Sequence, residues 1–399
     1  MTIAWSEKRN VFLLAVCQML FGSGRTLMVV TAPVIAYTIA ADKALATLPM
    51  ALVIVGTAIT TFPASIYMGR AGRKAGFILG TFIGTGGGLV CATAVIVGDF
   101  WLLCLGTLLF GAFAGFGQHY RFAAADSVAK EFRSTAISLV LAGGVIASLV
   151  GSELAKVGKG LIASDEFLGA YVFLIATTLL AAAVIMLLDI PGLTPSQAAE
   201  IRRPLSQIMR QPVFAVATVA ALVSQGTMNL LMTATPIAMV FKCGLSFNDS
   251  AFVIAWHGVG MFAPAFFTGN LIKRFGEIRI ITIGFMLQIA CVATALSGIG
   301  VTQFWFAMVL LGIGWNFAFT GGSSLLLQAH NVAERAKTQG AMNVLIYACV
   351  AVGSLSSGAL LHYLSWAWLN ILALPLIAVA LTATLWYGAT VRRAEARPA

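Results

Sequence analysis

Charged residues are scarce in this sequence. Only 10% of its 399 residues are charged, and 14 are acidic, whereas a soluble domain carries about 25% charged residues. Apolar residues make up 60% of the chain, and the mean hydropathy is +0.95. Apolar runs recur near the ~20 residues that cross a bilayer, where backbone groups must pair within the run. These features exclude a soluble domain and predict an all-α polytopic membrane protein.

Several catalytic and ligand-binding patterns are also absent. The chain has no C-x-x-C pair, no G-x-x-x-x-G-K-[ST] nucleotide loop, no H-E-x-x-H zinc motif, and no paired carboxylates or Ser/His dyad in a span. We therefore expect no cofactor, no metal site and no intramembrane enzyme. We interpret the six scattered cysteines as small buried hydrophobic residues rather than as disulfide partners or metal ligands. They are Cys17, Cys91, Cys104, Cys243, Cys291 and Cys349.

Twelve runs are long enough to cross a membrane. Lys8 and Arg9 precede a first run of about 30 residues, which is too long for a cleaved signal peptide and lacks a clear A-x-A site. The predicted spans are residues 11–39, 45–68, 75–97, 101–125, 134–156, 167–189, 212–241, 250–272, 279–298, 302–328, 338–361 and 365–389.

Lysine and arginine are unequally divided between the two sides of this predicted membrane. With the spans taken alternately, 18 of the 24 basic residues lie on the side of the N-terminus and four on the other, while Arg25 and Arg121 fall within spans. By the positive-inside rule, both termini are cytoplasmic. We expect a bacterial cytoplasmic (inner) membrane protein whose net charge of +10 reflects topology, with no nucleic-acid partner.

The two halves of the chain repeat each other at an offset of 203 or 204 residues. The matching pairs are SIYMGRAGRK (65–74) with GNLIKRFGEIR (269–279), VAKEFR (128–133) with VAERAK (332–337), and TAP (31–33) with ATP (234–236). We predict two six-helix bundles, residues 1–189 and 212–399, joined by a cytoplasmic linker at 190–211. Parallel repeats imply a pseudo-two-fold axis along the membrane normal, with a cavity between the halves.

The repeated basic loop resembles a motif of the major facilitator superfamily (MFS), G-x-x-x-D-R-x-G-R-R/K. The matching residues are Arg70, Gly72, Arg73 and Lys74 in the first copy, and Gly269, Arg274 and Gly276 in the second. The twelve-span layout and the central linker are similar to the family as well, so the resemblance covers nearly the whole chain. It implies two pseudo-symmetric six-helix bundles and secondary transport by alternating access.

This loop also departs from the family pattern. Ser65 replaces the first glycine, and Gly69 replaces the acidic residue that in the family helps to latch the halves in the outward-open state. Lys273 occupies the acidic position of the second copy, and Asp126, at the end of the fourth span, is a candidate substitute carboxylate. We interpret these loop residues as structural, with gating as the alternative.

Motifs of the family's drug–proton antiporters are not matched. Those antiporters carry G-x-x-x-G-P-x-x-G-G in the fifth span, whereas here Ser152 and Glu153 follow Gly151. Their fourth-span arginine falls on Gly111. Both departures disfavour drug efflux, which stays the alternative function. As a whole, the chain resembles compact bacterial carriers of riboflavin, which implies a vitamin-like solute.

Arg25 lies about 14 residues from each end of the first predicted span, beside Gly22 and Gly24. An unpaired arginine at this depth costs about 2.5–3.5 kcal/mol on insertion scales, so something must offset that cost. We interpret Arg25 as a clamp for an anion or carbonyl that faces the cavity. The alternative is an ion pair with Glu153 in the fifth span.

Two residues are candidates for proton coupling. Glu153 is the only carboxylate well inside a predicted span, and burial raises a carboxyl pKa, although a nearby Arg25 would oppose that shift. His257 is the other candidate, because histidine titrates near neutrality. Arg121, near the cytoplasmic end of the fourth span, could reach the membrane surface or pair with Asp126.

Neutral polar and aromatic side chains complete the predicted pocket, with helix–helix hydrogen bonding as their alternative role. They are Gln118, His119, Gln225, Asn229, Trp315, Asn316, Asn343 and Tyr347. One positive centre with amides and aromatic surface suits a flat, amphipathic or weakly anionic organic solute. We expect a monomeric transporter of such a solute, with protons as the candidate coupling ion and membrane lipid around it. A non-transporting sensor or assembly factor is the second alternative.

Overall fold

The computed structural model describes residues 5–129, 132–163, 165–190, 203–331 and 334–395, and these residues form helices and short connections without a strand. The helices of the N-terminal half are α1 (Trp5–Ile39), α2 (Leu48–Ala71), α3 (Arg73–Val97), α4 (Phe100–Gly117), α5 (Tyr120–Asp126), α6 (Arg133–Gly158) and α7 (Leu168–Met186). Those of the C-terminal half are α8 (Leu205–Met209), α9 (Pro212–Ile237), α10 (Phe247–Phe262), α11 (Ala265–Phe275), α12 (Glu277–Leu296), α13 (Val301–Leu325), α14 (Arg335–Tyr363), α15 (Trp366–Ile371) and α16 (Ala373–Glu395).

Within the described residues, eleven helical segments are long and apolar enough to span a membrane, and the α10–α11 pair makes a twelfth, bent by 41°. The twelve predicted spans agree with these segments in number and order. The break after Phe262 coincides with Pro264, whose ring removes a backbone donor and disfavours a straight helix. Residues 191–202 of the predicted linker, and parts of the VAKEFR and VAERAK motifs, lie outside the described residues.

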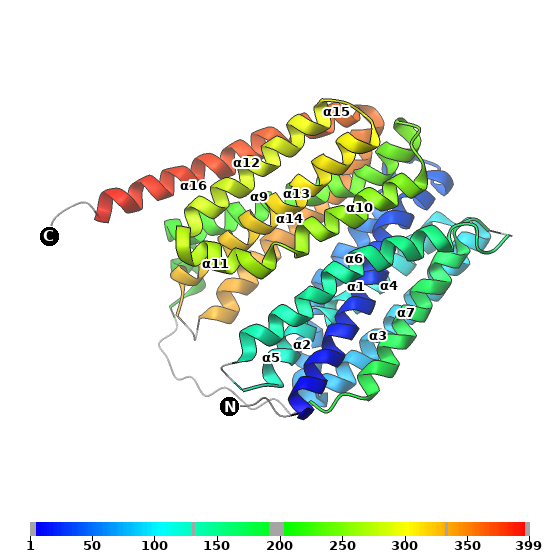
Figure 1. Cartoon of the computed structure of the whole chain (residues 1–399), viewed down its shortest axis with the longest axis horizontal. Helices are drawn as coiled ribbons and strands as arrows, with labels where there is room; N and C mark the ends of the chain where they lie inside the picture. Colours follow the sequence, from blue (N-terminus) through cyan, green and yellow to red (C-terminus); the bar gives the residue numbers. More distant parts are fainter. Residues whose placement is uncertain (1–4, 130–131, 164, 191–202, 332–333, 396–399) are drawn as a thin grey trace.

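The helices form two bundles, α1–α7 and α9–α16, that lie side by side (Figure 1). We call the end of the molecule at which α1 begins the linker face, and the opposite end, at which α1 is followed by the 3₁₀ turn Lys43–Leu45, the far face. Several contacts join the halves at the far face. They include the Tyr37–Phe241 ring stack (4.3 Å between centroids), the Phe167–Phe247 edge contact (5.3 Å) and a 3.0 Å hydrogen bond from the Gly358 N–H to Thr47 Oγ.

The predicted repeat is visible in backbone geometry. Gly72 precedes α3 with φ 88° and ψ 154°, and Gly276, 204 residues later, precedes α12 with φ 81° and ψ 157°. Only glycine adopts this region readily, because it has no Cβ. Thr31 and Thr235 are likewise equivalent: each hydroxyl donates to the carbonyl four residues earlier, at 2.9 Å and 2.8 Å.

Close helix packing explains the glycine at the fourth-span position where antiporters have arginine. A Cβ on Gly111 would lie 2.3 Å from the Val53 carbonyl oxygen of α2, and one on Gly56 would lie 2.4 Å from the Leu108 carbonyl oxygen of α4. Backbone therefore occupies the space that an arginine side chain would need. The position is used for packing α2 against α4.

The first helix is seated on α6 by a stripe of small residues. Gly143, Ala147 and Gly151 recur every four residues, so they share one face of α6. A Cβ on Gly151 would lie 2.3 Å from the Ser23 carbonyl oxygen, and one on Gly22 would lie 2.6 Å from the Ala147 Cβ. This contact, of the small-residue type found between membrane helices, fixes the rotation of α1 and thus the direction in which Arg25 points.

The six cysteines are unpaired, and four of them are buried.

Candidate functional site

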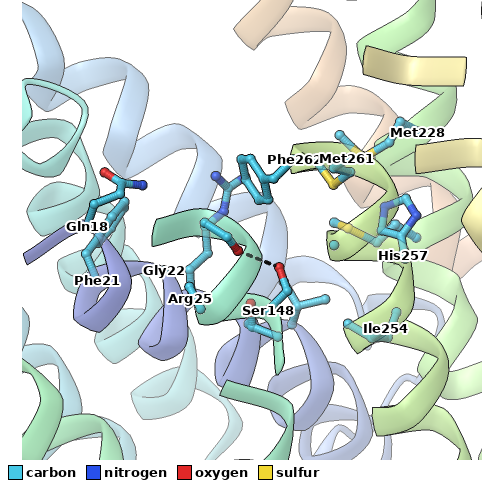
Figure 2. A pocket seen from close by; sticks show the side chains of 16 residues that line it. Gln18, Phe21, Gly22, Arg25, Ser148, Met228, Ile254, His257, Met261 and Phe262 are labelled. Atoms are coloured by element: carbon cyan, nitrogen blue, oxygen red, sulfur yellow. Dashed lines mark hydrogen bonds between the residues drawn. The ribbon is translucent and has the colours of Figure 1, made fainter. Parts of the chain in front are cut away.

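A cavity lies where α1 and α6 of one half meet α9 and α10 of the other. Figure 2 shows Phe21 and Arg25 of α1 on one side and His257 and Met261 of α10 on the other. The full lining is Gln18, Phe21, Gly22, Arg25, Thr26, Val29, Gly144, Ala147, Ser148, Met228, Met232, Ile254, His257, Gly258, Met261 and Phe262. Most of these side chains are apolar, with a few polar groups at fixed points, as in binding sites for small organic molecules.

Arg25 is the central polar group of this cavity. It lies in the interior of α1, 14 residues before the last helical residue, Ile39, or about 21 Å at 1.5 Å per residue. Phe21, Gly22 and Arg25 lie three, four and seven residues after Gln18, so the four residues form one stripe along α1 that faces the cavity. Within the described part of the chain, none of the ion pairs includes Arg25. Its guanidinium donors are therefore available to a ligand.

The alternative interpretation, an ion pair between Arg25 and Glu153, is wrong. Glu153 bonds Lys156 one turn along α6, with 2.7 Å between Oε1 and Nζ, and its side chain is 63% exposed. The reason is helix geometry: Gly151 faces α1, and Glu153, two residues later, lies about 200° further round the helix. Glu153 therefore points away from the cavity.

Because of this position, Glu153→Gln is expected to leave both the rate of transport and its pH dependence within about two-fold of wild type between pH 5 and 8. A carboxylate outside the cavity cannot exchange a proton with a solute in it. The measurement is initial uptake into proteoliposomes across that pH range, with Lys156→Gln as the matched variant. Loss of the pH dependence in Glu153→Gln alone would contradict the placement.

His257 lines the cavity but is only 1% exposed. Its Nδ1 lies 2.7 Å from the Met308 carbonyl oxygen, which fixes Nδ1 as the protonated donor and leaves Nε2 as an acceptor without a partner. Arg25 and His257 are the only titratable side chains that line the cavity within the described residues. His257 is thus the better placed of the two predicted proton-coupling candidates.

The remaining predicted pocket residues do not belong to this lining: Gln118, His119, Gln225, Asn229, Trp315, Asn316, Asn343 and Tyr347. Buried Asn229 donates to the Gln225 carbonyl, and buried Asn316 donates to the Met261 carbonyl and accepts from Thr268. The Asn316 bonds join α13 to α10 and α11, which is the helix-packing alternative, whereas the Asn229 bond lies within α9 itself. His119 likewise lies 3.2 Å from the Thr61 carbonyl oxygen inside the N-terminal half.

Gln225 and Trp315 form one hydrogen-bonded unit, and Gln225 lies one helical turn from the cavity-lining Met228. Trp315 Nε1 donates to Gln225 Oε1 at 2.6 Å, and the Trp315 ring stacks on Phe319 with 5.2 Å between centroids. Gln225 lies three residues before Met228 on α9, so it continues the cavity-facing stripe by one turn toward the linker face.

The basic loop forms a contact inside the N-terminal half. Arg73 pairs with Asp126 at the end of α5, and Lys74 donates to the Met186 carbonyl at 2.6 Å. Asp126 thus supplies the carboxylate that the loop lacks at Gly69, and it does not pair with Arg121. Arg70 has no ion-pair partner among the described residues, and Arg274 in the second copy lies over the Phe275 ring.

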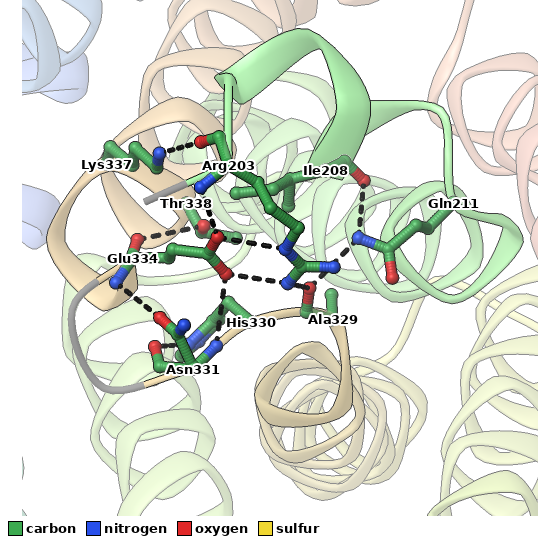
Figure 3. A network of polar contacts seen from close by, with 9 residues as sticks. All are labelled: Arg203, Ile208, Gln211, Ala329, His330, Asn331, Glu334, Lys337 and Thr338. Atoms are coloured by element: carbon green, nitrogen blue, oxygen red, sulfur yellow. Dashed lines mark hydrogen bonds and ion pairs between the residues drawn. The ribbon is translucent and has the colours of Figure 1, made fainter. Parts of the chain in front are cut away.

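A second polar network lies at the linker face of the C-terminal half (Figure 3). Arg203 binds both carboxylate oxygens of Glu334, through Nε at 2.9 Å and a terminal nitrogen at 2.6 Å, and also donates to the Ala329 carbonyl at 3.0 Å. Lys337 donates to the Arg203 carbonyl. These bonds attach the chain entering α8 to the start of α14.

The Arg203 guanidinium lowers the pKa of the fully buried Glu334 carboxyl from 4.5 to about 2. A carboxyl whose pKa is lowered by folding stabilises the fold at pH values above its pKa in the unfolded chain. This contribution is therefore complete above about pH 4.5 and is lost as the pH falls toward 2.

Glu334→Gln is expected to lower the melting temperature at pH 7 and to flatten its decline below pH 5. Thermal unfolding at pH 7 to 3 measures this, and Glu166→Gln, an exposed partner of Lys159, is the control. Equal pH profiles for Glu334→Gln and wild type would contradict the assignment.

The described residues contain no group of three His, Cys, Asp or Glu side chains placed to hold a metal ion. Two repeated helical bundles with a cavity at their interface define a secondary transporter.

The chain belongs to the Major Facilitator Superfamily, whose family model matches residues 14–348 and 217–399. It is 37% identical to the riboflavin transporter RfnT of Brucella anthropi over 96% of both chains, and 27% identical to the uncharacterized MFS-type transporter YdeG of Bacillus subtilis over 95% and 92% of the two chains. It also superimposes on a bacterial homolog of the human lysosomal transporter Spinster, solved inward-facing and occupied, with a TM-score of 0.72, 17% identity and coverage of 98% and 97%.

Proposed function

We propose that this transporter carries riboflavin, or a closely similar flat heterocycle, across the cytoplasmic membrane. The relative RfnT, similar over nearly its whole length, supports this solute class. The observation in the structure that carries the proposal is an arginine without a carboxylate partner, facing a cavity between the two halves. Its planar donor fork suits the carbonyl oxygens of an isoalloxazine ring.

The rest of the lining fits such a solute. Phe21 and Phe262 supply aromatic surface, Met228, Met232 and Met261 supply polarizable apolar surface, and the hydroxyl of Thr26 is a hydrogen-bonding group for a ribityl chain.

The arrangement of the halves supports alternating access. With the linker face in the cytoplasm, as the positive-inside rule indicates, the contacts at Tyr37–Phe241 and Thr47–Gly358 close the periplasmic side. We propose that residues 1–189 and 212–399 rock as two units about the cavity, and that the form described here faces inward.

The test is binding and transport by the purified protein. Riboflavin is expected to raise the melting temperature, because a ligand that binds the folded state stabilises it, while lumazine and thiamine serve as comparison solutes. Riboflavin-loaded counterflow in proteoliposomes then measures transport. Stabilisation by an unrelated cationic drug, with no response to riboflavin, would favour efflux and overturn the proposal.

A further inference from the structure

His257 carries a buried hydrogen-bond acceptor that the described chain leaves unpaired. Its Nδ1 donates to the Met308 carbonyl oxygen at 2.7 Å, so the neutral ring keeps its lone pair on Nε2. Nε2 is buried without a partner among the described residues, and His257 as a whole is 1% exposed. Buried polar atoms in folded proteins are nearly always hydrogen-bonded. An unpaired acceptor in a cavity wall therefore indicates a donor that comes from outside the chain, either a solute or water.

The free edge of this ring is on the cavity side. His257, Gly258 and Met261 lie three, four and seven residues after Ile254, so these four lining residues form one stripe of α10 that faces the cavity. Met308 belongs to α13, none of whose described residues lines the cavity. The two ring nitrogens point in widely different directions. With Nδ1 turned toward α13, Nε2 is directed away from α13 and toward the cavity.

Arg25 and His257 flank the same turn of α6. A Cβ on Gly22, three residues before Arg25, would lie 2.6 Å from the Ala147 Cβ. A Cβ on the glycine that follows His257 would lie 2.2 Å from Ser148 Oγ. Because Ala147 and Ser148 are consecutive, the guanidinium and the imidazole enter the cavity at about the same level, one from each half (Figure 2). α1 also contacts α10 directly.

The side chains around His257 allow a solute to reach it. Met228 and Met232 of α9 and Met261 of α10 line the cavity together with the histidine. Methionine is unbranched and has several rotatable bonds, so a bound ring displaces thioethers rather than helices. Among the described residues, no acidic side chain lines the cavity and competes for the donors of a solute.

We propose that His257 Nε2 accepts a hydrogen bond from an N–H group of the solute while Arg25 donates to a neighbouring carbonyl oxygen, so that the site selects heterocycles with an unsubstituted amide or imide edge. The inference rests on the proposed function and deepens it, because the isoalloxazine ring has such an edge, with N3–H between two carbonyls. A guanidinium has donors only, and the neutral imidazole offers an acceptor, so the pair matches C=O beside N–H. A solute held in this way bridges the two halves.

The experiment compares riboflavin with 3-methylriboflavin, in which a methyl group replaces the N3 hydrogen, by flavin fluorescence quenching on the purified full chain. Wild type is expected to bind riboflavin at least ten-fold more tightly, because a buried polar group left unpaired rejects the analogue. In His257→Asn, the shorter amide still reaches the Met308 carbonyl but supplies no acceptor at the Nε2 position. This variant should bind the two flavins within about two-fold of each other, with its affinity for 3-methylriboflavin within about three-fold of wild type.

Three further variants make the result specific. His257→Gln extends an amide oxygen toward the Nε2 position and should keep part of the preference. His257→Leu fills the space without an acceptor and should lose it; a preference retained in this variant would show that the methyl group is excluded by shape, which refutes the contact. His362→Asn is the matched control and keeps the preference, because His362 also has a buried ring nitrogen without a partner but lies outside the cavity lining.

The outcomes separate this inference from the proposed function. If wild type binds riboflavin no more tightly than 3-methylriboflavin, the contact is refuted, because water then satisfies Nε2, and the proposed function stands. If it binds neither flavin, the proposed function fails, and 1,8-naphthalimide against its N-methyl derivative decides the contact: a preference for the N–H form that His257→Asn removes supports it, and equal or absent binding refutes it. A His257→Asn variant that keeps the flavin preference but loses the pH dependence of transport also refutes it, since the histidine then only carries a proton.

Discussion

Arg25→Ala is expected to reduce transport at least 100-fold while leaving membrane insertion and folding intact. Two hydrogen bonds from a charged donor contribute about 1.5–3 kcal/mol each, and each 1.4 kcal/mol corresponds to a factor of ten. Folding should not suffer, because removing an arginine without a carboxylate partner also removes the cost of placing it in the membrane. Initial uptake rates in proteoliposomes, together with size-exclusion profiles and melting temperatures, measure both effects.

Two further variants make this result specific. Arg25→Lys keeps the charge but loses the planar fork, so a loss intermediate between wild type and Arg25→Ala is expected. Arg279→Ala removes an exposed cation at the linker face and should transport normally. Normal transport by Arg25→Ala would exclude the clamp, whatever the behaviour of the other two.

Gly258→Val is expected to reduce transport at least ten-fold. A Cβ on Gly258 would lie 2.2 Å from Ser148 Oγ and 2.5 Å from its Cβ, where α10 of one half crosses α6 of the other. Overpacking costs about 1–3 kcal/mol, and here it raises the free energy of the access state in which the halves meet at this crossing. The equilibrium between the two access states therefore shifts by about one power of ten or more.

A compensating substitution tests this explanation. Combining Gly258→Ala with Ser148→Gly removes the Ser148 side chain of α6 that the new Cβ on α10 would meet. The double variant should therefore transport several-fold faster than Gly258→Ala alone. Equal rates for the single and double variants, or wild-type transport by Gly258→Val, would show that this crossing does not limit the cycle.

The architecture was predictable because it depends on properties that sequence carries directly. Run length and hydropathy define the spans, and the Arg70/Arg274 and Gly72/Gly276 pairs define the repeat. Arg25 was predictable as a cavity residue because a mid-span guanidinium has few other stable positions.

Helix rotation and partner choice were not predictable in the same way. An ion pair of Glu153 with Arg25 was the alternative for this residue, although the Gly143–Ala147–Gly151 stripe already places Glu153 on the opposite face of α6. Asn316 could equally have faced a ligand or a neighbouring helix, and only the packed structure shows that it bonds the Met261 carbonyl of α10. The lining residues Gln18, Met228 and Met232 were missed because single amides and methionines on a helix give no pattern of their own.

The central claim is that Arg25 faces an aqueous cavity between the halves that opens at the linker face. It is tested most directly by Arg25→Cys in a chain whose six native cysteines are alanine, with that cysteine-free chain as the control. A membrane-impermeant cationic thiol reagent is expected to modify this cysteine when added from the cytoplasmic side, and riboflavin should slow the reaction. No modification from either side, under conditions that label a cysteine at exposed Arg279, would contradict the claim, because it would place residue 25 against lipid or in a sealed core.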